Sequence, residues 1–449
     1  MAQPTGMFAR FASAGLAALV ALGGAVVVAT ATTTRIDDAA ELVTAATRLD
    51  PGPGDLVVAF DVGDVDQFVV DASAEAARRA GGHSATRRGG SIGLRRITRD
   101  GATVHAPPSG YFIPMVFSAA PVDAARGAYG IEIAQVMAAG HVVVNEMTAD
   151  TTGARVGDQL ELRTRSGGTL TIRVGMIAAY DAVGGSELVF DTSVADRLGF
   201  TTATSTVMWG FDRAALETAL VAVGLEGRQD TAIARSWDLP DPDGTISTAR
   251  TKVALGEPWY RVNADDTISM HPDWVADSLT PDRIVLDPTI RVRARCHVAI
   301  VDDLSAALAD VAAAGLAGQI DVANANAYGG CYAPRYSRIS GYLSRHTYGM
   351  AFDTNTVSNC QGCRPRMHCD VVRIFRRHGF AWGGNFRRPD GMHFEWVGSP
   401  RDQIPYPSTY CPNIVSSTTE RMVPELGREV LAHGPSAAHV HHDDHVATP

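Results

Sequence analysis

The amino-acid sequence predicts an α+β fold, arranged as two soluble domains behind one N-terminal apolar segment. Residues 14–31 carry no charged side chain. Apolar and polar residues alternate on both sides of a glycine turn between 156 and 175, which is typical of a β-hairpin. Further on, a helix-periodic stretch at 304–315 precedes alternating segments at 350–353 and 393–397. Helices followed by such strands favour an antiparallel sheet covered by helices.

The apolar run 14–31 would measure about 27 Å as a helix, just enough to cross a bilayer. Arg10 and Arg35 bracket it. We favour a single-pass membrane anchor over a secretion signal cleaved after Ala29-Thr-Ala31, because the run is long for a signal core. Either interpretation exports the rest of the chain, so residues 1–35 are assigned to this segment.

Composition excludes several functions. The chain has 449 residues with 45% hydrophobic and 20% charged content, which is typical of globular protein with two or three domains. A formal net charge of −10 leaves no basic face for nucleic acid. Lys252 is the only lysine, and it follows Thr251 rather than the glycine of a Walker loop. Ala249 stands where the Ser-x-x-Lys of serine peptidases needs its serine.

Residues 36–237 form the predicted first domain. Its clearest element is the hairpin of 156–163 and 170–175 around Ser166-Gly-Gly-Thr. The segment Gly89-Gly-Ser91-Ile-Gly93 matches the Gly-x-Ser-x-Gly nucleophile elbow, but arginines flank it on both sides. We interpret it as a flexible basic loop, without the strand and helix that an elbow requires.

Residues 238–244, with two prolines and a glycine among acids, are predicted to link the first domain to a second at 245–415. The second domain should contain the helix at 304–315, a strand at 319–323, and a helix capped by Asp370 and ended by Gly379. A histidine-containing tail at 416–449 is expected to be largely disordered.

Two separated segments of the second domain offer three metal ligands. Gly349 supplies a turn after His346, and the alternation that follows puts Asp353 on one face of a strand. On the second strand, His393 and Glu395 share a face. Two imidazoles and one carboxylate, with a fourth position left for water, suit a catalytic zinc. Such a site points to amide hydrolysis.

The same chemistry needs a proton shuttle that does not bind the metal. Asp390, in the turn before His393, is the favoured general base, and Glu395 is its rival. Arg335 is the candidate cation for the oxyanion or for a substrate carboxylate. Ser344 and Tyr348 are candidates for substrate contact or for support of the ligands. Whether His368 or Cys369 closes the fourth zinc position stays open.

The pattern Ser344-x-His346-x-x-Gly349-x-Ala351-x-Asp353, followed by Asp390-x-x-His393, resembles the signature of the D-alanyl-D-alanine carboxypeptidase family of zinc peptidases. That family includes VanY-like carboxypeptidases and L-alanyl-D-glutamate endopeptidases, and the likeness covers roughly residues 290–400. It implies zinc bound by the two histidines and Asp353, Asp390 as base, an arginine such as Arg335 on the substrate, and peptidoglycan stem peptides as substrate.

Two positions depart from parts of that family. VanY-like members usually carry Glu where Asp390 stands, and the dipeptidases carry a second His where Glu395 stands. The departures favour the endopeptidase branch and leave the cleaved bond open. A second hypothesis also stays open: a non-catalytic wall-binding or membrane-complex assembly protein with a structural zinc site.

The first domain resembles the extracytoplasmic domain of MacB- or FtsX-type permeases, through Gly140-His-Val-Val-Val-Asn-Glu, Ala154-Arg-Val-Gly-Asp and Val174-Gly-Met-Ile. Those domains also follow a first membrane helix. This likeness implies an interaction module with a membrane-protein partner rather than a transporter, since no further span is present in the sequence.

All six cysteines fall in the second domain, and their even number in an exported chain predicts disulfides. We pair Cys296 with Cys331. A zinc cluster or redox pair at Cys360, Cys363 and Cys369 is the alternative. The tail histidines, which could bind metal weakly, are His439, His441, His442 and His445.

Overall fold

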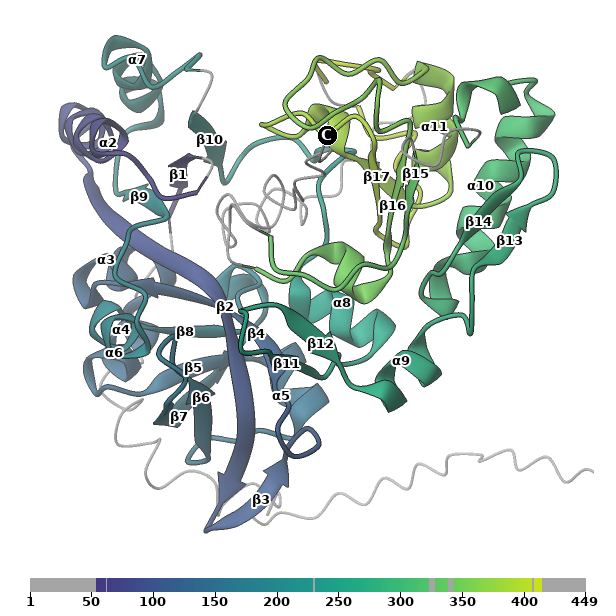
Figure 1. Ribbon diagram of the computed structural model, residues 1–449. Helices are drawn as coiled ribbons and strands as arrows, with labels where there is room; N and C mark the ends of the chain where they lie inside the picture. The colour runs from purple at the N-terminus through teal and green to yellow at the C-terminus, as the bar shows by residue number, and fades with distance from the viewer. Residues whose placement is uncertain are drawn as a thin grey trace, which may run out of the picture.

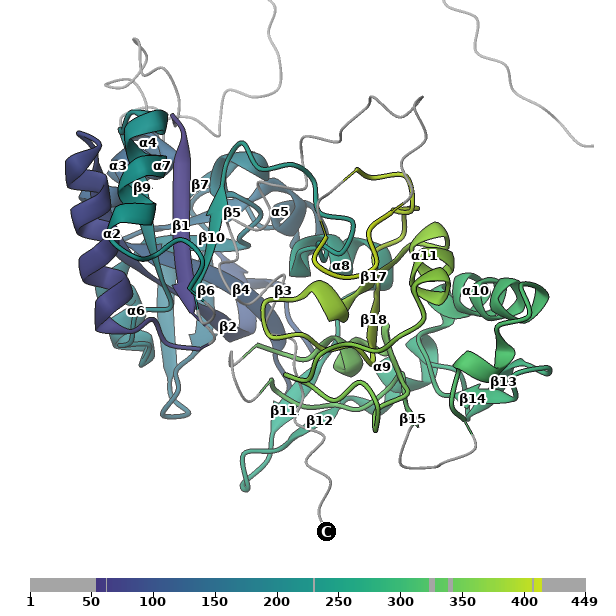
Figure 2. The ribbon, with the colours of Figure 1, turned by 90° about the horizontal axis from the view of Figure 1, so that it is seen from above.

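The computed structural model describes residues 54–61, 63–228, 231–322, 328–337, 342–405 and 408–413. The predicted membrane segment and the tail histidines lie outside these ranges, so both stay predictions. Within the described ranges, no helix is long and apolar enough to cross a membrane. We refer below to the N-terminal part (residues 54–237) and the C-terminal part (residues 245–413), which lie side by side (Figures 1 and 2).

The N-terminal part is built on one mixed sheet. Its described strands are β1 (Leu56–Asp61), β2 (His83–Arg99), β3 (Ala102–His105), β4 (Ile113–Ala120), β5 (Val142–Asn145), β6 (Gln159–Arg163), β7 (Thr169–Ala178), β8 (Leu188–Asp191), β9 (Ser205–Trp209) and β10 (Thr231–Arg235). The pairing runs β10-β1-β9-β2-β4-β8-β5-β7-β6, and β6 also pairs with β2. The six strands from β2 to β6 along this path therefore close into a barrel, which leaves them no free edge.

The helices of the N-terminal part are α2 (Gln67–Arg79), α3 (Val122–Tyr129), α4 (Ile131–Ala138), α5 (Glu146–Thr152), α6 (Thr192–Leu198) and α7 (Arg213–Ala222), with a 3₁₀ turn η1 at Asp181–Val183. The side chains of Asp66 and Asp212 cap the starts of α2 and α7. These two helices share a core with β1 and β9 (Figure 1). The elements described here combine a mixed sheet with helices, and the fold class as a whole stays a prediction.

The predicted hairpin is confirmed as β6 and β7, which pair antiparallel with Leu162 opposite Leu170. Gly167 provides the positive φ of +88° that the connecting turn needs. Alternate side chains along both strands, among them Leu160 and Ile172, are buried inside the barrel. The alternation of apolar and polar residues was sufficient to predict this hairpin, because β6 and β7 are consecutive in the sequence and pair with each other.

The prediction of a flexible basic loop around Ser91 is wrong. The segment lies in the middle of β2, a strand of 17 residues that pairs with β9, β4 and β6 in turn. The arginines that suggested a loop lie on the strand instead, and Arg87 is buried against Tyr129 and Ser205. The Gly-x-Ser-x-Gly motif is therefore no nucleophile elbow, since no helix follows the serine.

Residues 238–244 connect β10 to α8 (Thr248–Leu255) without helix or strand. They are anchored rather than free. The carboxylate of Asp243 is buried, forms an ion pair with Arg376, and accepts hydrogen bonds from the Trp382 amide and the Asn385 side chain. The connection is thus packed into the C-terminal part, while the exact domain boundaries stay predictions.

The C-terminal part contains α9 (Pro272–Ser278), α10 (Val301–Ala313), α11 (Cys369–Arg377) and the strands β11 (Tyr260–Val262), β12 (Ile268–Met270), β13 (Ile284–Asp287), β14 (Val292–Ala294), β15 (Tyr328–Gly330), β16 (Ala351–Thr354), β17 (Phe380–Trp382) and β18 (His393–Trp396). Its short 3₁₀ turns are η2 (Val298–Ile300), η3 (Ala317–Gln319), η5 (Arg345–Tyr348) and η6 (Gly383–Asn385). The central sheet is antiparallel in the order β15-β16-β18-β17. One hydrophobic core joins this sheet to α10 and α11.

The helix expected at 304–315 is confirmed as α10, with Leu304, Leu308 and Val311 fully buried. The strand expected at 319–323 is wrong. The described residues there form η3 followed by an extended segment, in which the Asp321 amide bonds to the Asn355 side chain and not to a neighbouring strand. Residue 323 lies outside the described ranges.

The second predicted helix is confirmed as α11, but its cap is misassigned. His368, not Asp370, is the N-cap, and its imidazole Nδ1 accepts a hydrogen bond from the Asp370 amide. Asp370 lies in the first turn, where its carboxylate pairs with Arg373. Gly379 follows the helix with a φ of +77°, as expected for a left-handed C-terminal cap.

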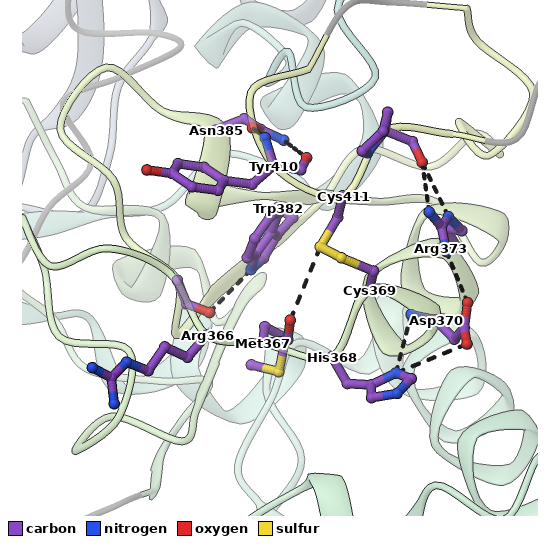
Figure 3. The surroundings of a disulfide bond; sticks show 12 residues. Arg366, Met367, His368, Cys369, Asp370, Arg373, Trp382, Asn385, Tyr410 and Cys411 are labelled. Atoms are coloured by element: carbon purple, nitrogen blue, oxygen red, sulfur yellow. Dashed lines mark hydrogen bonds and ion pairs between the residues drawn. A yellow bond between two sulfur atoms is a disulfide. The ribbon is translucent and has the colours of Figure 1, made fainter.

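The six cysteines form three disulfides: Cys296–Cys331, Cys360–Cys363 and Cys369–Cys411. The pairing of Cys296 with Cys331 is as predicted. Figure 3 shows how Cys411 reaches Cys369 at the start of α11. The guanidinium of Arg373 also donates to the Pro412 carbonyl. The Cys369–Cys411 disulfide holds the last described residues against the helix. Together with the Cys360–Cys363 disulfide, it leaves no free thiols for the zinc cluster considered above.

Candidate metal centre

The first ligand, His346, is held by a short turn. It lies in η5, where the Ser344 hydroxyl caps the turn by accepting a hydrogen bond from the His346 amide (3.2 Å). Gly349 ends the turn with a φ of +68°. A Cβ at this glycine would lie 2.8 Å from Leu279 and 2.9 Å from the His297 amide, so no side chain fits. The chain then enters β16, which carries Asp353.

The other two ligands face each other across a strand pair. In the antiparallel register of β16 and β18, Asp353 is directly opposite His393, and Ala351 is opposite Glu395. Residues opposite one another share a face of the sheet, with Cβ atoms about 5 Å apart. The sheet therefore places Asp353 and His393 on one side, while Phe352 and Phe394 are buried on the other.

His346, Asp353 and His393 converge as predicted, with their ligand atoms within 4.8 Å of one another. Asp353 Oδ2 lies 3.0 Å from His346 Nε2, and Asp353 Oδ1 lies 2.9 Å from His393 Nδ1. The two imidazole nitrogens are 3.3 Å apart. Ligands about 2.1 Å from a tetrahedral zinc would be separated by about 3.4 Å, so the donor set fits such an ion.

The three side chains are almost completely buried, with exposed fractions of 1–2%. His346 Nδ1 lies 2.9 Å from the Cys331 carbonyl, which can only accept a hydrogen bond. Nδ1 of a neutral His346 is therefore protonated, and Nε2 presents its lone pair to the cluster. The Cys296–Cys331 disulfide fixes the residue that supplies this carbonyl.

His393 is oriented by a second carboxylate. Its Nε2 lies 3.6 Å from Glu395 Oε2, while Nδ1 faces Asp353. Burial lowers the pKa of the His393 imidazole, but its contacts with Asp353 and Glu395 and the nearby charge of Asp390 raise that pKa well above the usual value. In the absence of a metal, His393 thus carries a proton that a cation would replace.

Sequence reasoning missed the partner of Glu395. Arg345, adjacent to the first ligand, is buried and its Nε lies 3.0 Å from Glu395 Oε1. The same guanidinium donates to Thr251 and to the Ile246 carbonyl. An arginine next to a metal ligand in the sequence suggests a buried ion pair. The partner of Arg345, however, is 50 positions further along the chain, and only the fold identifies it as Glu395.

Asp390 lies close to His393, as its predicted role requires. It is buried, its amide donates to the Gly383 carbonyl (2.8 Å), and its carbonyl accepts from the His393 amide (3.2 Å). A Cβ at Gly383 would lie 2.6 Å from the Asp390 carbonyl and 3.1 Å from His393 Cβ. The glycine therefore lets η6 pack closely behind both residues.

The remaining predicted residues surround the His346 turn. The Arg335 amide bonds to Thr347 Oγ1 (3.0 Å), and the Arg335 carbonyl accepts from the Ser344 amide (3.1 Å). Ser344 and Tyr348 have exposed fractions of 0% and 1%, which favours support of the ligands over substrate contact. Burial raises the pKa of the Tyr348 phenol, so it stays protonated.

Neither residue proposed to close the fourth metal position is available for it. His368 uses Nδ1 to cap α11 and is only partly buried, and Cys369 is bonded to Cys411 (Figure 3). Within the described ranges, the group of ligand-type side chains whose donor atoms all lie within 4.8 Å of one another consists of His346, Asp353 and His393. A metal held by them would keep a coordination position for a water or a substrate.

A family model described as D-alanyl-D-alanine carboxypeptidase matches residues 338–396 of the chain. The matched segment contains the three converging ligands together with Asp390 and Glu395, and Arg335 lies just before it. Among curated proteins, none matches the chain. The family match supports a peptidase related to the cell wall in this segment, whereas the likeness of residues 36–237 to MacB-type domains stays a prediction.

Proposed function

We propose that the chain is a zinc-dependent peptidase that hydrolyses an amide bond in the stem peptides of peptidoglycan. The observation that carries this proposal is the convergence of His346, Asp353 and His393 within 4.8 Å, inside the segment that matches the peptidase family. The protein is further proposed to act outside the cytoplasm, held to the membrane through residues 14–31 or released by their cleavage.

Zinc is the metal that this donor set favours. Two neutral imidazoles and one carboxylate, with a fourth position open, are the ligands of catalytic zinc sites rather than of magnesium or calcium sites. Zinc bound by these residues would supply Lewis-acid chemistry and a water of lowered pKa. The protonated His346 Nδ1 and the Glu395 carboxylate would keep both imidazoles in the orientation that binding requires.

Asp390 is proposed as the proton shuttle. Its carboxylate would accept a proton from the attacking water and then deliver it to the leaving amine, so that the peptide bond breaks as the new carboxyl forms. Glu395, the rival for this role, is held by Arg345 on one side and His393 on the other. These contacts suggest that the function of Glu395 is to orient the imidazole of His393.

Arg335 is proposed to donate hydrogen bonds to the developing oxyanion or to a substrate carboxylate. One observation supports its position near the metal ligands. Its amide and carbonyl are tied to Thr347 and Ser344, which flank His346 in the η5 turn. The guanidinium itself donates to the nearby Ala333 carbonyl at 3.4 Å.

The bond cleaved is proposed to be either the terminal D-alanyl-D-alanine bond or the L-alanyl-D-glutamate bond. Mass spectrometry of peptidoglycan fragments incubated with the protein, with and without a chelator, separates the two. Release of D-alanine identifies a carboxypeptidase, and a cut after L-alanine identifies an endopeptidase. A zinc-loaded protein that yields neither product would contradict the proposal and favour a wall-binding protein with a structural metal.

A further inference from the structure

A cavity of about 220 Å³ lies between the N-terminal and C-terminal parts. Ser91 and Gly93 of β2 form one wall. Arg163, the last residue of β6, and Arg165 just after the strand form another. The volume corresponds to about seven water molecules at about 30 Å³ each, enough for a carboxylate and the short chain that bears it.

The C-terminal part supplies the opposite wall through Tyr260 and Tyr336. Tyr260 lies on β11, which forms a bridge to the N-terminal part by pairing its backbone with Phe112 (Figure 1). The two tyrosine rings meet edge to face with centroids 6.0 Å apart. Both parts of the chain are therefore needed to form the cavity.

Aromatic rings position the guanidinium groups of Arg163 and Arg165. Arg165 lies over the ring of Phe200, 4.5 Å from its centroid, and Arg163 lies 5.8 Å from the ring of Phe112. Across the described ranges, no carboxylate forms an ion pair with either guanidinium, although Asp266 also lines the cavity. Two guanidinium groups held on aromatic rings beside a cavity form a site for an oxyanion, because each can donate two parallel hydrogen bonds.

The uncharged hydroxyl groups that line the cavity also suit an oxyanion. Burial raises the pKa of both Tyr260 and Tyr336, so their phenols stay protonated. The two phenols are hydrogen-bonded to each other, so one phenol proton and the Ser91 hydroxyl remain as further hydrogen-bond donors for a ligand. The glycine of the β2 wall also contributes, since a Cβ at Gly93 would lie 3.1 Å from the Tyr260 hydroxyl. A Cβ there would also lie 3.0 Å from the Phe112 side chain, so the glycine lets both aromatic side chains pack against β2.

The cavity is linked to the metal centre through the backbone. Tyr336 follows Arg335, whose amide and carbonyl are hydrogen-bonded to the η5 turn that carries His346. Tyr336 also forms a bridge with Leu343, directly before Ser344. A ligand in the cavity would thus contact the segment that supports the first metal ligand.

We propose that this cavity is a subsite in which Arg163 and Arg165 bind a carboxylate of the peptide substrate. The proposal rests on the function proposed above and gives the N-terminal part a role in it, that of selecting substrates with a carboxylate remote from the cleaved bond. In a D-alanyl-D-alanine substrate the D-glutamate carboxylate is such a group. In an L-alanyl-D-glutamate substrate D-glutamate adjoins the cleaved bond, and the C-terminal carboxylate of the peptide is the remote group. Inorganic phosphate shares the oxyanion chemistry and serves as the competing probe.

The test compares two variants of the full chain. Arg163→Gln/Arg165→Gln removes both charges. Arg95→Gln removes an exposed charge whose guanidinium donates to Thr169 and which is not among the described residues that line the cavity. Calorimetry in the inactive His346→Ala background measures binding of an L-alanyl-D-glutamate stem peptide, of the same peptide with every carboxylate amidated, and of phosphate. For the active protein, KM and kcat are measured with the first peptide.

The double variant is expected to bind the free-acid peptide at least about tenfold more weakly and to raise KM with little change in kcat, because uniform binding is lost. The amidated peptide should bind both proteins equally, and Arg95→Gln should behave as the parent. An unchanged KM for the double variant, or arginine-dependent binding of phosphate alone, would overturn the subsite.

The two proposals fail in different ways. If no peptide is cleaved but the free-acid peptide still binds through the arginines, the peptidase function is refuted and the subsite stands. If the peptide is cleaved with the same KM by all three proteins, the function stands and the subsite is refuted. Should His346→Ala fail to fold, the KM comparison alone decides.

Discussion

At the scale of single residues, two acids next to His393 have different surroundings. Glu395 is paired with the buried guanidinium of Arg345 and lies on the side of His393 away from Asp353. Asp390 lies on the turn before the strand, held by Gly383. These contacts predict that Glu395 affects the metal ligands whereas Asp390 affects the reaction.

Asp390→Ala should lower kcat by about 10²- to 10⁴-fold while zinc remains bound, because the variant loses the proton shuttle but keeps all three ligands. Peptide turnover and zinc content are measured on the same preparation. Asp277→Ala, which removes an exposed acid on α9, serves as the matched control. Loss of zinc, or normal turnover, would show that the role of Asp390 is wrong.

Glu395→Gln should weaken zinc binding by about 10- to 100-fold, since the histidine loses the carboxylate that orients it. Competition with a chromophoric chelator measures the affinity. At saturating zinc, turnover should largely return, which Asp390→Ala would not show. A variant with normal zinc affinity but no activity at saturating zinc would instead assign the general base to Glu395.

At the scale of secondary-structure elements, the sequence identified what short-range patterns determine. Alternation located β16 and β18, and Gly349 located the turn between two ligands. The strand prediction at 319–323 failed because an apolar residue can be buried without belonging to a strand. Ile320 follows the η3 turn and is buried, and its amide bonds back to Ala317. Nothing local identifies the Cys331 carbonyl as the partner of His346, since that contact depends on how the chain folds back.

The segment between β10 and α8 makes a pH-dependent contribution. Burial and the neighbouring charge of Asp243 raise the pKa of Asp241 to about 7. A carboxyl whose pKa is raised on folding stabilises the folded state while it is protonated. Its contribution to the free energy of unfolding is therefore complete below about pH 4, near the pKa of an aspartate in the unfolded chain, and is lost as the pH rises through about 7.

Asp241→Asn should therefore raise the melting temperature at pH 8, and the gain should shrink as the pH falls from 7 to 4. The amide keeps an oxygen that can accept from the Asp243 amide, as the carboxylate does at 2.8 Å. Melting curves of both proteins across this range provide the measurement. An increase in melting temperature that does not depend on pH would refute the raised pKa of Asp241.

At the scale of the whole molecule, a buried ion pair joins the two parts. Lys252 Nζ of α8 lies 2.7 Å from Glu187 Oε1, which precedes β8, and both side chains are inaccessible to solvent. Glu187 also accepts a hydrogen bond from the Val116 amide of β4. Lys252 is the sole lysine of the chain, and its ion pair with Glu187 joins the two parts. The helix that carries it, α8, lies beside the N-terminal part (Figure 2).

Lys252→Met should lower the free energy of unfolding by about 3–5 kcal/mol, because it leaves the Glu187 charge buried and unpaired. Adding Glu187→Gln should restore part of the loss, since the charge is removed and an acceptor for Val116 is retained. Denaturant unfolding measures both. Arg78→Met, which breaks an exposed ion pair with Glu75, should change stability by less than about 1 kcal/mol. Equal effects of Lys252→Met and Arg78→Met would contradict this account.

The claim that His346, Asp353 and His393 hold a catalytic zinc is tested most directly by titrating metal-free protein with zinc while following peptide hydrolysis. To exclude metal bound in the tail, the protein carries alanine at the four histidines between 439 and 445. We predict that activity rises from zero to a plateau at about one equivalent of zinc, and that His346→Ala stays inactive throughout. Hydrolysis by the metal-free protein, or full activity of His346→Ala, would contradict the account.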